Sequence, residues 1–164
     1  MKEFTVALAG NPNCGKSTIF NVLTGSRQHV GNWPGKTVEK KEGYFTHNGK
    51  KVKVVDLPGT YSLSAFSMEE VIARDYILDE RPDIVVAVVD STNLERNLYL
   101  AVQLLELGTR VIVDLNMSDL AKSNHIKIDI DKLAFALQSE VIKTVGSKGS
   151  GVEQLKDLIT TYYQ

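Results

Sequence analysis

Gly10-Asn11-Pro12-Asn13-Cys14-Gly15-Lys16-Ser17 matches the phosphate-binding pattern G-x-x-x-x-G-K-[ST] at every fixed position. The apolar residues 4–9 before it predict a buried strand, and residues 16–23 after it predict a helix. Where a strand, such a loop and a helix follow one another, the loop amides and the helix N-terminus converge on one point and favour an anion there. This stretch therefore predicts an α/β fold with a phosphate-binding loop after its first strand.

Each residue type in this loop suits contact with a nucleotide. Gly10 and Gly15 let the backbone approach phosphates without an intervening Cβ atom. We expect Lys16 to reach the β and γ phosphates and the Ser17 hydroxyl to ligate Mg²⁺. Cys14, the only cysteine, is expected to fill the loop as a small residue rather than to act as a catalytic thiol. The other positions expected to contact nucleotide here are Asn11, Asn13 and Thr18.

The composition is that of an ordinary globular domain. The chain has 164 residues, 43% of them hydrophobic, and a net charge of −1, which suits one domain with one core and gives no bulk attraction to nucleic acid. The longest apolar run, residues 84–89, is far shorter than the about 20 residues that span a bilayer, and the N-terminus lacks a signal peptide. The single cysteine fits a reducing compartment. We therefore expect residues 1–164 to form one soluble, cytoplasmic domain.

Strand and helix patterns alternate along the chain, as in α/β folds. Strands are predicted at residues 4–9, 37–47, 51–56, 84–90, 111–115 and 141–145, and helices at residues 16–23, 68–78, 94–107, 131–137 and 152–163. Residues 25–36 form a polar, glycine-rich stretch, residues 57–67 are predicted to be irregular, and Asn48-Gly49 predicts a tight hairpin. This pattern predicts a three-layer, six-stranded, mostly parallel sheet with one antiparallel strand and about five helices. Ligands in such sheets bind beyond the carboxyl ends of the strands.

A second motif, Asp56-Leu57-Pro58-Gly59, follows the apolar strand residues Val52–Val55. An aspartate at this strand end can hold Mg²⁺ through water, and Gly59 can offer its backbone amide to a γ-phosphate. By itself this motif is usually an ordinary turn. Its spacing after the phosphate loop favours the nucleotide interpretation.

A third motif, Asn116-Met117-Ser118-Asp119, follows the predicted strand at residues 111–115. The Asp119 carboxylate can accept hydrogen bonds from guanine N1–H and from the exocyclic amine, a donor pair that adenine lacks. We expect Asn116 to tie this base loop to the phosphate loop. The alternative for Asp119 is a helix N-cap.

Thr37 is the first residue of the second predicted strand and follows the polar stretch after the first predicted helix. A threonine in that region of a nucleotide switch closes over Mg²⁺ and the γ-phosphate. The alternative is a threonine that merely begins a strand, and only the neighbouring motifs argue against it.

The chain resembles the N-terminal G domain of the FeoB family of prokaryotic ferrous-iron transporters, and the resemblance covers essentially the whole chain. It rests on residues 10–17, on Gly31-Asn-Trp-Pro-Gly-Lys-Thr37-Val-Glu39, on Asp56-Leu-Pro-Gly-Thr-Tyr-Ser62, on Ala73-Arg-Asp-Tyr-Ile77 and on Thr92-Asn-Leu-Glu-Arg-Asn-Leu-Tyr-Leu100. The resemblance implies a Ras-like P-loop GTPase that binds GTP or GDP with Mg²⁺. It also implies helical and membrane-embedded domains in a parent transporter, so that this chain is the cytoplasmic part of a cell-membrane protein.

The expected catalytic residues are Lys16, Asn13, Thr37 and Gly59. Ras-like enzymes orient the attacking water with a glutamine after D-x-x-G, where this chain has Thr60. Slow intrinsic hydrolysis is therefore expected. The resemblance implies a substitute, a K⁺ ion held by Asn13 and by carbonyls around Gly31 and Trp33, which would neutralise charge as an arginine finger does.

The last guanine-binding segment, expected at Val145, Gly146 and Ser147, departs from the usual Ser-Ala-Lys pattern. Glycine can still supply an amide to guanine O6 but leaves the loop looser. Met117 also replaces the lysine of N-K-x-D, whose stem packs on the base. These departures predict weak nucleotide binding and fast GDP release.

The sequence allows two interpretations of Trp33, which lies in a loop of glycines and proline. It either packs locally or contacts another domain or a second copy of the chain.

The sequence also allows two functions. One is that of a transporter's G domain, and the other is that of a free-standing GTPase of ribosome assembly or tRNA modification, which would need an RNA-binding surface. A non-hydrolysing P-loop module is disfavoured by Lys16, Ser17, Thr37 and Asp56 together.

Overall fold

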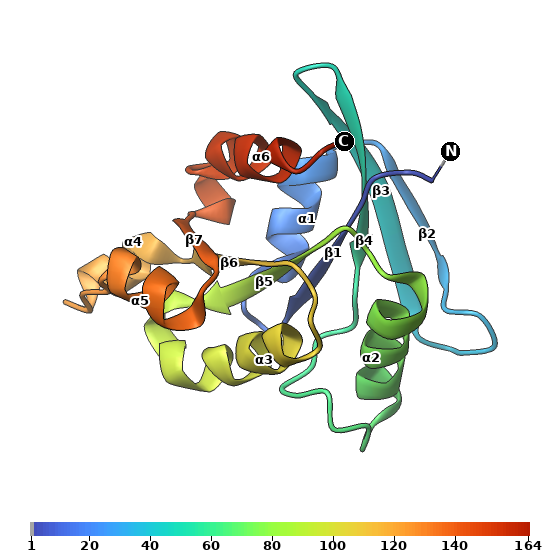
Figure 1. Cartoon of the computed structure of the whole chain (residues 1–164), viewed down its shortest axis with the longest axis horizontal. Coiled ribbons are helices and arrows are strands. Elements are labelled where there is room, and N and C mark those ends of the chain that lie inside the picture. Colours follow the sequence, from blue (N-terminus) through green and yellow to red (C-terminus); the bar gives the residue numbers. More distant parts are fainter. Residues whose placement is uncertain (1) are drawn as a thin grey trace.

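A seven-stranded sheet organises the computed structural model, which describes residues 2–164 (Figure 1). The strand order is β2-β3-β4-β1-β5-β6-β7. The strands are β1 (Thr5–Gly10), β2 (Gln28–Asn32), β3 (Glu39–His47), β4 (Lys50–Asp56), β5 (Ile84–Asp90), β6 (Val111–Asn116) and β7 (Glu140–Lys143). β3 runs antiparallel to both of its neighbours, and the other neighbouring pairs are parallel. The mostly parallel sheet with one antiparallel strand is thereby confirmed.

Helices cover both faces of this sheet, which gives the three layers that the sequence predicts (Figure 1). They are α1 (Lys16–Thr24), α2 (Met68–Glu80), α3 (Leu94–Glu106), α4 (Ser118–Ser123), α5 (Ile130–Leu137) and α6 (Val152–Thr161). Buried side chains of α1 and α6 pack on one face, and those of α2 and α3 pack on the other. Each face thus has its own apolar core. The central strand β5 contributes to both cores, which explains its unbroken apolar sequence.

The sheet has one strand more than predicted, because β2 lies in the polar, glycine-rich stretch for which the sequence predicts no strand. All five of its residues are exposed, so it has no apolar alternation by which a sequence pattern could be recognised. Its conformation is set by backbone pairing with β3, from Gln28 opposite Gly43 to Asn32 opposite Glu39. The short helix α4 was also absent from the predicted elements.

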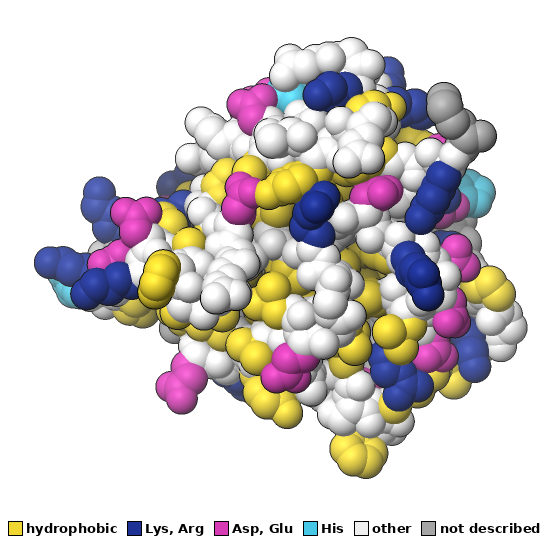
Figure 2. Space-filling model, in the orientation of Figure 1, with side chains coloured by type: hydrophobic (Ala, Val, Ile, Leu, Met, Phe, Trp, Pro, Cys, Tyr) yellow, Lys and Arg dark blue, Asp and Glu magenta, His cyan; other side chains and the backbone are white. Residues whose placement is uncertain are grey.

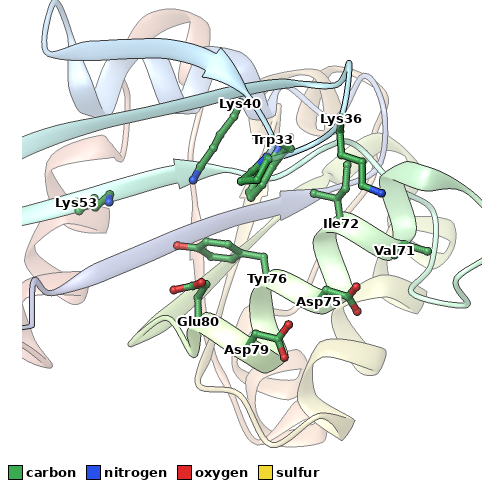
Figure 3. A pocket seen from close by; sticks show the side chains of 11 residues that line it. Trp33, Lys36, Lys40, Lys53, Val71, Ile72, Asp75, Tyr76, Asp79 and Glu80 are labelled. Atoms are coloured by element: carbon green, nitrogen blue, oxygen red, sulfur yellow. The ribbon is translucent and has the colours of Figure 1, made fainter.

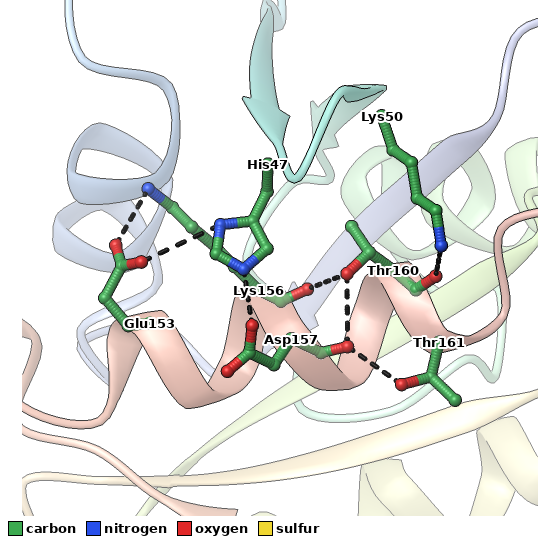
Figure 4. Close-up of polar contacts among 7 residues, drawn as sticks. All are labelled: His47, Lys50, Glu153, Lys156, Asp157, Thr160 and Thr161. Carbon is green, nitrogen blue, oxygen red and sulfur yellow. Dashed lines mark hydrogen bonds and ion pairs between the residues drawn. The ribbon is translucent and has the colours of Figure 1, made fainter.

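The hairpin between β3 and β4 forms as the Asn48-Gly49 pair predicts. Both residues have positive φ angles, 51° and 77°, as the tight primed turn requires. The hairpin end is fastened to α6, where His47 Nε2 lies 2.5 Å from Asp157 Oδ1 and Lys50 Nζ donates to the carbonyl of Thr160 at 3.1 Å (Figure 4). These contacts hold the antiparallel edge of the sheet against the last helix.

None of the helices in residues 2–164 combines the length and apolar character that crossing a membrane requires.

Candidate nucleotide-binding site

A cavity of about 580 Å³ opens on the loop between β1 and α1. Its lining residues are Asn11, Pro12, Asn13, Gly15, Lys16, Ser17, Gly59 and Met117. Three of the predicted motifs contribute to this lining. They do so because β1, β4 and β6 run parallel and end at the same edge of the sheet.

Two glycines of the loop are required by close contacts. Gly15 has a φ of 88°, and a Cβ atom there would lie 2.2 Å from Nδ2 of Asn116. A Cβ atom on Gly10 would lie 2.5 Å from the Cys14 sulfur and 2.8 Å from the Val88 carbonyl oxygen. The loop is thus packed between the base loop and β5, and it directs its backbone into the cavity. Asn11 is buried at the start of the loop, whereas Asn13 is exposed and Thr18 half-buried.

Lys16 and Asp56 form an ion pair at this edge, with 2.5 Å between Nζ and Oδ1. About a tenth of each side chain is exposed. Burial raises the pKa of the Asp56 carboxyl above its usual value, and the neighbouring Lys16 opposes that shift. The pair brings together two predicted site residues that lie forty positions apart in the sequence. This pair uses one of the three N–H donors of the Lys16 ammonium.

Gly59 reaches the cavity because its segment is anchored on both sides. The amide of Leu57 donates to the Leu8 carbonyl at 3.0 Å, and the amide of Thr60 donates to the Gly10 carbonyl at 3.0 Å. The Thr60 side chain is buried, whereas Tyr61 is exposed beneath the guanidinium of Arg96. Neither position therefore resembles the water-orienting glutamine of Ras-like enzymes.

Asn116 ties the base loop to the phosphate loop, as the sequence predicts. Its Nδ2 donates to the Cys14 carbonyl at 3.1 Å, and its Oδ1 accepts the Gly146 amide at 2.9 Å. One buried side chain thus links three loops of the site. Met117, beside it, lines the cavity in a left-handed conformation with a φ of 58°.

Asp119 lies in the first turn of α4 and forms an ion pair with Lys148, with 3.2 Å between Oδ2 and Nζ. Although burial opposes the shift, hydrogen bonds from Lys148 and from the Leu120 amide lower the Asp119 pKa. The carboxylate is thereby kept in the acceptor form that guanine recognition needs. Lys148 is not among the residues predicted for the site, and its place three residues after Val145 was the available signal.

The segment Val145–Ser147 lies against α1. Gly146 is buried, and a Cβ atom there would lie 2.9 Å from Cδ1 of Ile19. Its amide is engaged by Asn116, so this glycine is packed and bonded rather than loose. Val145 is buried and Ser147 is exposed.

The first switch residues lie elsewhere in this structure. Thr37 is exposed, and the phosphate cavity is not lined by Gly31, Trp33 or Thr37. Trp33 is only 6% exposed and packs edge-on against Tyr76 of α2, with ring centroids 5.5 Å apart. Lys40 lies over its ring in a second cavity between β3 and α2 (Figure 3). Local packing, one of the two alternatives for Trp33, is therefore what the structure shows.

Comparisons with known proteins agree with this geometry. A family model described as "Ferrous iron transport protein B" matches residues 4–159. The chain is 54% identical to the Fe(2+) transporter FeoB of Escherichia coli (strain K12) over an alignment of 166 residues, which covers 99% of this chain and 22% of that protein. The chain therefore spans about a fifth of the length of the curated relatives that it matches.

Solved structures give the same result. The FeoB G-domain from Methanococcus jannaschii superposes with a TM-score of 0.87 at 52% identity, covering 99% of this chain and 98% of that one. The cytosolic domain of the T. maritima FeoB iron transporter in a GDP form gives a TM-score of 0.95 at 48% identity, covering 100% of this chain and 64% of that one. A GMPPNP form of the same domain gives a TM-score of 0.94 at 49% identity, covering 98% of this chain and 64% of that one.

Proposed function

The chain belongs to the ferrous iron transport protein B family, and on this premise we propose that it is the GTP-binding and GTP-hydrolysing regulatory domain of a prokaryotic ferrous-iron transporter. The observation that carries the proposal is the convergence of Lys16, Gly59 and Met117 on one cavity, with Asn116 bonded to the loop behind it. Residues 1–164 would be one G domain. Its partners would be guanine nucleotide and the helical and membrane domains of the parent protein.

The cytosolic face of the cell membrane is the expected location, because the T. maritima relatives are cytosolic domains. Acidic and basic side chains lie close together over the face drawn in Figure 2, and the net charge is −1, so nucleic acid is not an expected partner. The free-standing GTPase alternative is correspondingly disfavoured. Association with a second copy of the chain is open to test.

The residues at the cavity fit Mg²⁺. Ser17 supplies a hydroxyl and Asp56, paired with the adjacent Lys16, supplies a carboxylate, and Mg²⁺ prefers such oxygen ligands. Thr37 would complete the set only after the first switch moves. When bound, the ion would neutralise charge on the β and γ phosphates.

Three residues of the chain would bind the other parts of the nucleotide. Lys16 would hold the phosphates, the Gly59 amide would sense the γ-phosphate, and Asp119 would select guanine. Since Thr60 is buried and the exposed Tyr61 lies beneath the Arg96 guanidinium, no glutamine-like side chain would orient water, and intrinsic hydrolysis should be slow.

A K⁺ ion is proposed to compensate for the absence of a glutamine-like side chain that orients water. Asn13 lines the phosphate cavity, where a cation would neutralise charge that develops between the β and γ phosphates. The Trp33 carbonyl is paired within its own segment here, since it accepts the Lys36 amide at 2.9 Å, and neither Gly31 nor Trp33 lines the phosphate cavity. They could join Asn13 only after the first switch rearranges.

Phosphate release from GTP should be faster in KCl than in NaCl at equal ionic strength, by about one order of magnitude, which is less than an arginine finger gives. Asn13→Ala is expected to abolish this difference and to leave GDP affinity nearly unchanged. Asn93→Ala, an exposed asparagine outside the phosphate loop, is the matched control and should keep it. Equal stimulation by K⁺ in the Asn13→Ala variant would refute Asn13 as a ligand of the ion. Equally slow hydrolysis in both salts by the unmodified chain would refute K⁺ activation itself.

A nucleotide-dependent first switch can be followed through Trp33, the single tryptophan of the chain. Hydrogen bonds from Trp33 N to the Val38 carbonyl and from Lys36 N to the Trp33 carbonyl, both 2.9 Å, close the short loop that also carries Thr37. Movement of Thr37 towards Ser17 should therefore withdraw the indole from Tyr76.

With Mg²⁺ and a non-hydrolysable GTP analogue, Trp33 fluorescence is expected to shift towards the emission of an exposed indole, whereas GDP should leave it unchanged. Thr37→Ala is the control, because it removes the ligand that would pull the loop and should lose the shift. Identical spectra with both nucleotides would contradict a switch that moves Trp33.

A further inference from the structure

Asp114 is a carboxyl group in the middle of the core. It lies on β6 with 0% exposure, and its neighbours in the adjacent strands are the apolar residues Val88 and Ile142. Oδ1 lies 2.5 Å from the hydroxyl oxygen of Thr144, while Oδ2 is buried without a hydrogen-bond partner among residues 2–164. An ionised carboxylate is costly in such surroundings, so the position favours a protonated acid.

This carboxyl is connected to the nucleotide site through Thr144. The Thr144 hydroxyl lies 3.3 Å from Asn116 Oδ1, which also accepts the Gly146 amide. The Thr144 carbonyl accepts the amide and the hydroxyl of Ser118 at 3.2 and 2.9 Å. Asp114 is therefore one side chain away from the residue that joins the phosphate, base and guanine loops.

The hydrogen bonds of the Thr144 hydroxyl depend on the protonation state of Asp114. The Thr144 hydroxyl has a single proton and cannot donate to Asp114 and Asn116 at once. An ionised Asp114 takes that proton in a charge-assisted bond and leaves Asn116 Oδ1 without it. A protonated Asp114 instead donates to the hydroxyl oxygen, and the hydroxyl is then free to donate to Asn116.

The two forms of Asp114 are balanced near neutral pH. Burial raises its pKa to about 7, and the bond from Thr144 opposes the shift. The titratable neighbour on the opposing loop is Cys14, whose thiol pKa is raised to about 11, mainly by burial and in smaller part by the Asp114 charge. Cys14 therefore stays a neutral thiol over the range in which Asp114 titrates.

We propose that Asp114 is a positioning residue for the guanine-nucleotide site: its protonated form completes the hydrogen-bond chain Asp114–Thr144–Asn116, and its ionised form breaks it. The inference rests on the proposed nucleotide-binding function. A negative charge on Asp114 beneath the phosphate loop would in addition repel the bound phosphates. Nucleotide binding and protonation of Asp114 should therefore favour each other.

The sign of the pH effect follows from this linkage. If nucleotide binds the protonated form better, binding raises the Asp114 pKa, and affinity is unaffected below the pKa of the free chain. Above about pH 7 affinity falls, by at most about tenfold per pH unit for one group, until the pKa of the bound form is reached.

The test is GDP affinity with Mg²⁺ from pH 6 to 8.5. The unmodified chain should bind GDP with constant affinity up to about pH 7 and progressively weaker above it. Asp114→Asn cannot ionise but can donate to Thr144, so its profile should be flat over the upper half of this range. Thr144→Ser keeps the hydroxyl and should keep the original profile, as should Asp131→Asn, which removes an exposed charge.

The outcomes separate this inference from the proposed function. GDP binding whose pH profile is the same in the unmodified chain and in Asp114→Asn would overturn the role of Asp114 and leave nucleotide binding intact. No GDP binding at any pH would instead overturn the proposed function. If Asp114→Asn does not fold, calorimetry of the unmodified chain near pH 7.5 in buffers of different ionisation enthalpy decides: proton uptake on GDP binding supports the inference, and none overturns it.

Discussion

Replacing Asp119 with asparagine is expected to change the base preference of the site from guanine to xanthine. The carboxylate offers two acceptors to guanine N1–H and the exocyclic amine, whereas an asparagine offers one acceptor and one donor. Xanthine carries a carbonyl where guanine carries the amine, so it matches the asparagine. Loss of a charge-assisted pair is worth about 1.5–3 kcal/mol, which corresponds to about ten- to a hundredfold weaker GDP binding.

Competition of GDP and XDP against a fluorescent nucleotide measures this change. Lys148→Ala is the control, because it removes the ion-pair partner of Asp119 but keeps the carboxylate, and should keep the guanine preference. Lys148 is largely exposed, so the pair itself contributes little. Unchanged GDP affinity in Asp119→Asn would show that the base binds elsewhere.

Replacing Lys16 with alanine is expected to remove GTP hydrolysis, with a loss of at least about a hundredfold in turnover, the scale found for one transition-state donor. The side chain is the one cation that the phosphate loop directs at the cavity. Its loss also leaves Asp56 mostly buried without its partner, so the Asp56 pKa should rise further and the folded state should become less stable as pH increases.

Phosphate release measures the loss of hydrolysis, and thermal unfolding at two pH values measures the loss of stability. Lys132→Ala removes an exposed lysine and should change neither. Asp56→Asn combined with Lys16→Ala removes the unpaired charge, so it should restore stability but not hydrolysis. Retained turnover in a folded Lys16→Ala variant would contradict the assigned role.

The parts of the fold that could be predicted are those determined by residues close together in the sequence. The loop at residues 10–17 lies between an apolar strand and a helix. The tight turn at residues 48 and 49 requires positive φ angles, which Asn48 and Gly49 adopt more readily than most residues. Asp56 and Asn116 end parallel strands, so their meeting at one edge follows from topology. The Asn116 contact with Cys14 is the clearest case in which a predicted link is present.

The parts that could not be predicted depend on partners distant in sequence. β2 exists because β3 offers it a backbone edge, and nothing in the exposed residues 28–32 indicates a strand. Trp33 is buried because Tyr76 of α2 lies beside it, and the Asp119–Lys148 pair needs two separate loops to meet. The burial of Asp114 also could not be predicted, because an aspartate within a strand sequence indicates an exposed position until its neighbours in space are known.

The most direct test of the central claim is phosphate release from GTP by this chain with Mg²⁺ in KCl, measured beside ATP and beside Lys16→Ala. Release that saturates with GTP concentration, is absent in Lys16→Ala and is much weaker with ATP is the expected result. Equal release by the unmodified chain and by Lys16→Ala, or equal use of GTP and ATP, would contradict a phosphate-loop GTPase whose base is selected by Asp119.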